Sequence, residues 1–455
     1  MRVVGNLHAE MLLGLFLRGA GAISSFALLW MIARMFGADV VGLYQLGLTT
    51  MVMVGTAVGL GLPELVIRKV ANLIQKGDLG DARTTFLACF RYMLKRGLLS
   101  IVIVVLLAVP FSRYVLSEPQ AAMFLIVFAP AVLFLPLLRL TNALLRTVGR
   151  VMISQSLEGV FYTTLAAAGL ALAWSVGAAD DRLLPVWLYQ LGLAIAVLIS
   201  WLMVKRVMKG WPEGSALIGR NDGTLIAAAP IIAFAGDWLL LLVLTTFLGV
   251  EQAGIYRTAF QFCMLFQLVN SSFAMMAGPH MARAAGGHDP RQVRRIVRSA
   301  GLIGLALCLP LAIAGWIVPA WLLGLFGPEF RQGALGLQIL LLGQIINVGI
   351  GPVGTALVML HRERYVLVLE GVATGVGVLV ALLLVERLEI AGVAAGTLVA
   401  SAIRNLANYA KLRRVLGRAQ QDEADPVLDA GMVSPTGMVS PTGMVGPTID
   451  RDGSA

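Results

Sequence analysis

Apolar stretches of membrane-spanning length, separated by short polar segments, recur along the chain as far as about residue 415. A helix needs about 20 mostly apolar residues to cross a bilayer. Twelve stretches meet this condition, at 10–33, 40–62, 92–111, 120–140, 152–176, 183–204, 224–248, 253–277, 299–323, 333–358, 365–385 and 390–409. The pattern predicts an all-α, polytopic membrane protein with about twelve transmembrane helices.

A nine-residue motif occurs twice, once between the first and second predicted spans and once between the seventh and eighth. Residues 36–44 and 248–256 both read apolar-Gly-x₄-Gly-apolar-Tyr, and the offset is 212 residues. Leu-Glu-Gly-Val at 157–160 recurs at 369–372 with the same offset, in the equivalent spans. Six spans separate the copies, so the halves are predicted to be parallel repeats that form two six-helix lobes. Folds of this kind bind substrate between their halves and work by alternating access.

The repeat divides the chain into segments. We predict an N-terminal six-helix lobe over 1–208, a cytoplasmic linker over 209–222 and a C-terminal six-helix lobe over 223–414. The polar tail, 415–455, ends in the hexapeptides GMVSPT, GMVSPT and GMVGPT, a composition typical of a disordered segment. Within the repeated motif, the glycines are expected to form tight turns and the tyrosines to lie in the aromatic belt at the membrane surface.

The composition agrees with a membrane environment. Apolar residues make up 58% of the chain and charged residues 13%, whereas a soluble domain carries about 25% charged residues. The three cysteines lie in apolar runs and the four histidines are scattered, so neither a disulfide framework nor a metal site is predicted. Phosphate-binding loops, nucleophile elbows and zinc spacings are absent from the sequence. We therefore expect no cofactor and no enzymatic activity.

The net charge of +10 is distributed unevenly between the predicted loops. With the N-terminus inside, 28 of the 35 Lys and Arg residues fall in or beside inner segments and five in outer loops. This positive-inside bias predicts that both termini are cytoplasmic. It also explains the net basic charge, because the Lys and Arg residues are expected to contact the lipid bilayer of the cell inner membrane. No nucleic-acid partner is therefore predicted.

Three ionisable residues lie deep in predicted spans, where such groups are costly and usually face a cavity or a partner. They are Arg18 in the first span, Asp237 in the seventh and Arg257 in the eighth. Together they predict a water-filled cationic cavity between the halves that would bind an anionic head group such as a pyrophosphate, because Arg binds phosphate bidentately. Arg18 and Asp237 could instead pair with each other across the two halves.

Charges at the inner ends of spans three and four have two interpretations. Arg91, Lys95 and Arg146 are either substrate ligands at the cytoplasmic side of the cavity or side chains that extend to the membrane surface. The second interpretation is favoured for these residues and for Arg139 beside them.

Two further pairs of polar residues lie within spans. Glu158 and Glu370 are expected to bond inner-loop arginines rather than relay protons. Gln344 and Asn347, in span ten, either line the cavity or join helices.

Several short motifs resemble one membrane transport family. They are Ala33-Arg34-Met35-Phe36-Gly37 with Gly42-Leu43-Tyr44, Gly61-Leu62-Pro63 before a basic segment, Arg362-Glu363-Arg364-Tyr365, and Ile390-Ala391-Gly392-Val393-Ala394-Ala395-Gly396. Over about 1–415 the chain is similar to the bacterial O-antigen and exopolysaccharide repeat-unit flippases. These belong to the multidrug/oligosaccharidyl-lipid/polysaccharide exporter superfamily.

The resemblance implies two six-helix lobes in a V shape and translocation of an undecaprenyl-pyrophosphate-linked oligosaccharide. It also implies a cationic central cavity, onto which Arg18 is the best-placed match. Coupling to a proton or sodium ion is common in the superfamily, and Asp237 is the candidate for it. Polysaccharide polymerases or other assembly proteins would be the partners of such a flippase.

Three other functions compete with this one. A multidrug/cation antiporter of the same superfamily would favour acidic, aromatic-lined cavities, whereas this chain is rich in Arg inside its spans. A membrane glycosyl-polymerase or ligase would need a large catalytic loop on the outer face, and the predicted outer loops are all short. A non-transporting component of a polysaccharide assembly complex would have no reason to bear the cost of deep charges.

Overall fold

The computed structural model describes residues 2–178, 180–215, 224–286 and 289–424, which are almost entirely helical and contain no β-strand. The predicted all-α fold class is therefore confirmed. Residues 425–455 of the predicted tail and 216–222 of the predicted linker lie outside the described residues.

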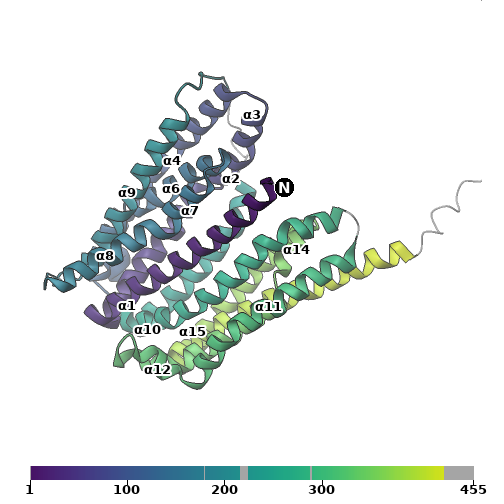
Figure 1. The fold of residues 1–455 in the computed structure, drawn as a ribbon. Coiled ribbons are helices and arrows are strands. Elements are labelled where there is room, and N and C mark those ends of the chain that lie inside the picture. Colours follow the sequence, from purple (N-terminus) through teal and green to yellow (C-terminus); the bar gives the residue numbers. More distant parts are fainter. Residues whose placement is uncertain (1, 179, 216–223, 287–288, 425–455) are drawn as a thin grey trace, which may run out of the picture.

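The helices form two bundles that follow one another in the sequence. The first contains α1 (Arg2–Gly59), α2 (Leu62–Leu65), η1 (Val66–Val70), α3 (Ala71–Gln75), α4 (Leu79–Tyr114), α5 (Ala121–Phe128), α6 (Ala131–Thr147), α7 (Val151–Ser156), η2 (Leu157–Phe161), α8 (Tyr162–Ser175) and α9 (Leu184–Val207). The second contains α10 (Thr224–Gly286), α11 (Pro290–Ile317), α12 (Pro319–Gly324), η3 (Pro328–Gly333), α13 (Ala334–Ile350), α14 (Val353–Met359) and α15 (Glu363–Ala424). The bundles meet along α1 and α10 and diverge toward the end where the N-terminus lies (Figure 1).

Three long helices are sharply kinked, and each contains two of the predicted spans. Gly37 in α1 has φ 84° and ψ −178°, and Gly249 in α10 has φ 86° and ψ 173°, a region open essentially only to glycine. The third kink, in α15, is at Glu389. Among the described residues, nine helices are long and apolar enough to cross a membrane. The three kinked helices cross twice, which accounts for the twelve predicted spans.

The second glycine of each repeated motif brings the two bundles into contact. A Cβ atom on Gly42 would overlap the carbonyl oxygen of Val250, and a Cβ atom on Gly254 would overlap that of Ala38. The offset of 212 residues relates Gly42 to Gly254 and Ala38 to Val250, so the same contact is made twice in equivalent positions. We call this end of the molecule, where Gly37 and Gly249 also lie, the kink end.

Side-chain hydrogen bonds between the bundles lie between the kink end and the middle of the molecule. They run from Trp30 Nε1 to the Leu325 carbonyl (2.9 Å), from Trp238 Nε1 to Thr50 Oγ1 (2.9 Å) and from Thr246 Oγ1 to the Val115 carbonyl (3.3 Å). Together with the glycine contacts, they close the space between the bundles at the kink end.

The tyrosine of each motif is buried, so the prediction that these residues lie in a membrane-surface belt is wrong. Tyr44 is 3% exposed and Tyr256 1%. Tyr44 packs edge-on against Phe128, and the Tyr256 hydroxyl shares a hydrogen bond of 2.8 Å with Thr397. Each tyrosine follows its kink by seven residues, about 10 Å of helix, which places it inside its own bundle rather than at the surface.

Candidate functional site

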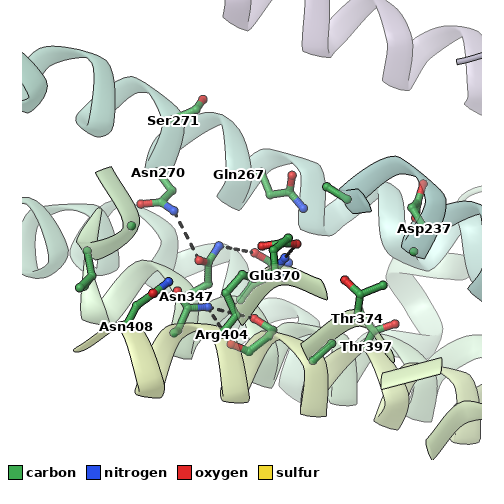
Figure 2. A pocket seen from close by; sticks show the side chains of 18 of the residues that line it. Asp237, Gln267, Asn270, Ser271, Asn347, Glu370, Thr374, Thr397, Arg404 and Asn408 are labelled. Carbon is green, nitrogen blue, oxygen red and sulfur yellow. Dashed lines mark hydrogen bonds and ion pairs between the residues drawn. The ribbon is translucent and has the colours of Figure 1, made fainter. Parts of the chain in front are cut away.

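The second bundle encloses a polar cavity of about 530 Å³, lined by side chains from α10, α13, α14 and α15. Six amide side chains face it, and we call this cavity the amide pocket; the six are Gln267, Asn270, Gln344, Asn347, Asn405 and Asn408. Hydroxyl groups of Ser271, Thr374, Thr397 and Ser401 add to the lining. Figure 2 shows Gln267 and Asn270 on one side of the pocket and Asn347, Thr374 and Asn408 on the other.

The charges of the amide pocket neutralise each other. Glu370 forms an ion pair with Arg404, and the Glu370 side chain is only 12% exposed. This confirms the expectation that Glu370 bonds an arginine. The other carboxylate in the lining, Asp237, is also paired, as described below.

The amides of the pocket are partly linked to one another. Asn270 Nδ2 donates to Asn347 Oδ1 at 3.5 Å, and Asn347 Nδ2 donates to Gln344 Oε1 at 3.3 Å. Asn347 therefore both lines the cavity and joins α13 to α10, whereas Gln344 lines the cavity and bonds within its own helix. Asn408 is 4% exposed, and its Oδ1 atom has no hydrogen-bond partner within the part of the chain that the structure describes.

A second cavity of about 560 Å³, the central cavity, lies between the bundles and is lined by α1, α6, α8, α9 and α10. It adjoins the amide pocket, because both are lined by Phe234, Asp237, Phe260, Met264, Gln267 and Ser271. Its charged lining residues are Arg139, Asp237 and Arg257. A ligand in the central cavity could therefore reach from one bundle into the interior of the other.

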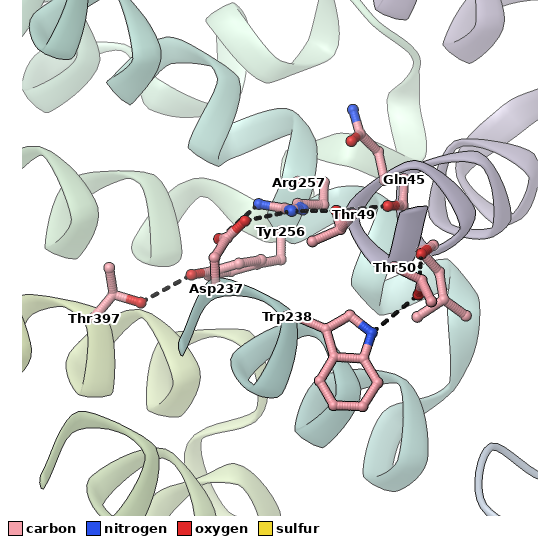
Figure 3. A network of polar contacts seen from close by, with 9 residues as sticks. Gln45, Thr49, Thr50, Asp237, Trp238, Tyr256, Arg257 and Thr397 are labelled. Atoms are coloured by element: carbon pink, nitrogen blue, oxygen red, sulfur yellow. Dashed lines mark hydrogen bonds and ion pairs between the residues drawn. The ribbon is translucent and has the colours of Figure 1, made fainter. Parts of the chain in front are cut away.

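Asp237 and Arg257 form a bidentate ion pair in the wall of the central cavity (Figure 3). Arg257 Nη1 lies 2.9 Å from Asp237 Oδ1, and Nη2 lies 2.8 Å from Oδ2. The same Nη2 also donates to Thr49 Oγ1, in the other bundle, at 2.5 Å. Arg257 is 6% exposed, so its charge is neutralised within the protein. Asp237 thus pairs with Arg257 and not with Arg18.

Arg139 is the cation of the central cavity that lacks a carboxylate partner among the described residues. Its Nη1 atom is 3.4 Å from Thr56 Oγ1, and its guanidinium lies 6.0 Å from the centre of the Phe234 ring. The expectation that Arg139 extends to the membrane surface is therefore wrong. The structure turns it toward the space between the bundles, which sequence position alone does not reveal.

Arg18 does not itself line the central cavity, but it lies on α1 before residues that do. Ala22, Ser25 and Leu29 line this cavity. Arg18 precedes them by four, seven and eleven residues, which places it on the same face of α1. In the described part of the chain it forms no ion pair.

The other predicted site residues lie away from both cavities. Arg91 and Lys95 are exposed on α4, on the helix face that continues into the exposed Leu98 and Val102. Arg146 forms an ion pair with Glu158 and donates to Ser154 Oγ at 2.8 Å. Glu158 therefore bonds an arginine, as expected. Across the described residues, no group of three or more His, Cys, Asp or Glu side chains could hold a metal ion.

Comparison with known proteins identifies a matching family model and solved structures with this fold. The MatE family model matches residues 226–383, and no curated protein matches the sequence. The chain resembles the inward-facing structure of a multidrug resistance MATE family transporter of the MOP superfamily, with a TM-score of 0.76 and 14% identity over 88% of this chain and 96% of that one.

Two further structures show the same fold. One is a MOP superfamily transporter from Pyrococcus furiosus, with a TM-score of 0.63 and 15% identity over 90% of this chain and 94% of that one. The other is an outward-facing MATE family transporter, with a TM-score of 0.52 and 16% identity over 89% and 98%. The named proteins are transporters rather than enzymes, in agreement with the prediction from the sequence. Residues 226–383 thus match the MatE family model, and the chain has the two-lobe fold seen in these MATE and MOP superfamily transporters.

Proposed function

We propose that the protein moves an undecaprenyl-pyrophosphate-linked oligosaccharide across the bacterial inner membrane. The observation that supports this substrate is the charge of the central cavity. Asp237 is engaged by Arg257 and Glu370 by Arg404, so Arg139 and Arg18 are the charges left to meet a substrate. An excess of arginine over free carboxylate suits a pyrophosphate, which Arg binds bidentately.

The mechanism in this proposal is alternating access. The positive-inside bias orients the kink end toward the outside and both termini toward the cytoplasm. The contacts at the kink end then close the outer side, and the bundles diverge on the cytoplasmic side. The higher TM-score with the inward-facing than with the outward-facing structure, 0.76 against 0.52, supports this orientation of the closed end.

Coupling to a proton or a sodium ion through Asp237 is part of the proposal. Arg257 Nη2 contacts both Asp237 and Thr49 of the other bundle. Neutralising Asp237 would leave the buried Arg257 without its counter-charge, which is strongly unfavourable. Arg257 would then have to move, and its bond across the bundles to Thr49 would break. A polysaccharide polymerase or assembly complex would act next on the translocated substrate.

A multidrug/cation antiporter is the second candidate, and the comparisons favour it. The MatE match and the multidrug transporter that shares the fold both support this function. A cationic substrate would require Asp237 or Glu370 to be released from its arginine. Cavity charge can differ within the superfamily, since the Pyrococcus furiosus transporter is described as having a binding pocket of reverse polarity.

Deletion of the gene, in a host without a second transporter of this kind, separates the two candidates. For the flippase, lipid-linked intermediates should accumulate on the cytoplasmic leaflet and surface polysaccharide should fall. Undiminished surface polysaccharide, no trapped intermediate and raised sensitivity to cationic drugs would instead assign the antiporter.

Complementation by variants of Arg18 and Arg139 tests the proposed role of these two arginines. Arg18→Ala and Arg139→Gln should each reduce complementation by about tenfold or more at unchanged protein level, because a charged hydrogen bond contributes about 1.5–3 kcal/mol. Arg113→Gln is the matched control, since Arg113 is exposed at the end of α4 and lines neither cavity.

A further inference from the structure

The amide pocket differs from the central cavity in the chemistry it offers to a ligand. Its only charged groups, Asp237, Glu370 and Arg404, are all held in ion pairs. Its aromatic lining is limited to Phe234 and Phe260. Among the described residues a cationic drug would meet no free carboxylate there, and an apolar drug would leave the amides and hydroxyls of the lining without partners.

Several polar groups in this pocket await a partner. Gln267 and Thr374 form no hydrogen bond with any residue that the structure describes, and both line the pocket. Asn408 is almost completely buried, yet its Oδ1 atom is unpartnered. Asn408 is the buried group of the three, and a buried polar group without a partner costs about 1–3 kcal/mol, whereas Gln267 is exposed and Thr374 is half-buried. A ligand that both donates and accepts hydrogen bonds would satisfy all three.

We propose that the amide pocket binds the neutral, hydroxyl-rich glycan of the substrate while the central cavity holds its phosphates. An amide carries two donors and an acceptor, and a sugar hydroxyl both donates and accepts, so the two surfaces are complementary. The volume of about 530 Å³ lies in the range of about 300–1,000 Å³ found for small-ligand sites. Because the two cavities share the Asp237 and Gln267 walls, one head group can occupy both.

This inference rests on the proposed function, and a binding experiment separates the two. The full-length protein in nanodiscs is titrated with undecaprenyl pyrophosphate, and separately with undecaprenyl pyrophosphate that carries a neutral trisaccharide of hexose and N-acetylhexosamine. We expect the trisaccharide to tighten binding by about tenfold or more, since it adds several hydrogen bonds. Asn408→Leu with Thr374→Val, which change residues that line the amide pocket but not the central cavity, should bring the two affinities together while leaving the affinity for undecaprenyl pyrophosphate unchanged.

One control variant and two contrary results complete this experiment. Gln332→Leu removes an exposed amide that lines neither cavity and should preserve the preference for the trisaccharide. Neither substitution in the pocket leaves a described partner unsatisfied, so the folded state should persist. Binding of undecaprenyl pyrophosphate without any preference for the trisaccharide, or a preference that survives Asn408→Leu with Thr374→Val, would overturn the inference alone. Failure of both probes to bind would overturn the proposed function as well.

Discussion

The two bundles share the same backbone arrangement but differ in their polar side chains. The offset of 212 residues relates Gly37 to Gly249 and Gly42 to Gly254, and each pair has the same conformation or contact. The polar residues of the second bundle lack such counterparts. Asp237 corresponds to Ser25, Arg257 to Gln45, Gln267 to Gly55, Asn270 to Val58 and Thr374 to Tyr162.

The difference explains why the amide pocket lies in the second bundle. In the first bundle Tyr162 packs edge-on against Tyr189, and Tyr189 against Tyr44. In the second bundle Thr374 faces open space at the position of Tyr162. The repeat thus gives the two bundles a common backbone frame, and the residues that differ between the copies create the amide pocket in the second bundle. Four sets of substitutions test this division between frame and chemistry.

Replacing Asp237 alone by Ser, its counterpart in the first bundle, should have the largest effect on stability. Asp237→Ser alone leaves Arg257 buried and unpaired and should destabilise the protein by on the order of 3 kcal/mol. Adding Arg257→Gln removes the unpaired charge, so the double variant should recover most of the loss. Thermal unfolding in detergent measures both; a double variant less stable than Asp237→Ser would contradict the assigned pairing.

Adding a methyl group at the contact between the bundles should shift the conformational equilibrium. Gly42→Ala or Gly254→Ala would overlap a backbone carbonyl, which costs about 1–3 kcal/mol in a packed site, and should disfavour closure of the kink end. Spin labels on Arg150→Cys and Arg362→Cys, with the native cysteines replaced, report the separation of the opposite ends by electron paramagnetic resonance.

The shorter separation should gain population in these variants. Gly371→Ala is the matched control, because a Cβ atom there meets nothing within 4 Å. An unchanged distance distribution for both Gly42→Ala and Gly254→Ala would show that this contact does not set the equilibrium.

The equivalent glutamates should differ in function while resembling each other in stability. Glu158→Gln and Glu370→Gln each remove a partly exposed ion pair, worth about 1 kcal/mol or less. Only Glu370 lines a cavity, so only Glu370→Gln should alter transport by the reconstituted protein. Equal losses of transport in the two variants would mean that the first bundle also contributes to binding.

The smallest effect is expected on the lipid-facing side of the first bundle. Arg91→Gln and Lys95→Gln change exposed residues that line neither cavity, and such changes usually alter stability by less than about 0.5 kcal/mol. Transport and unfolding temperature should both remain at their original values. A marked loss of transport would place these residues in the substrate path.

The frame could be predicted from the sequence because it depends on local and repeated signals. Span length, the position of Gly37 and Gly249 and the parallel repeat all follow from hydropathy and spacing. The sequence also predicts that Asp237 and Arg257 lie within spans. It does not predict that they pair with each other, since Arg18 is an equally available partner for Asp237.

The amide pocket as a whole could not be predicted from the sequence, because its residues form no continuous motif. Its amides come from three helices, and in the sequence they lie far apart, at 267–270, 344–347 and 405–408. In the sequence Arg139 resembles a helix-end charge, and only the folded structure shows that its guanidinium turns toward Phe234 of the second bundle.

The central claim is that free cationic charge in the central cavity, and not free carboxylate, selects the substrate. Proteoliposomes containing the purified protein allow a direct test, in which transport of a fluorescent undecaprenyl-pyrophosphate-linked oligosaccharide is compared with transport of ethidium. The account predicts translocation of the lipid-linked oligosaccharide, reduced by about tenfold or more in Arg139→Gln, and no ethidium transport. Ethidium transport that survives Arg139→Gln, without movement of the oligosaccharide, would contradict it.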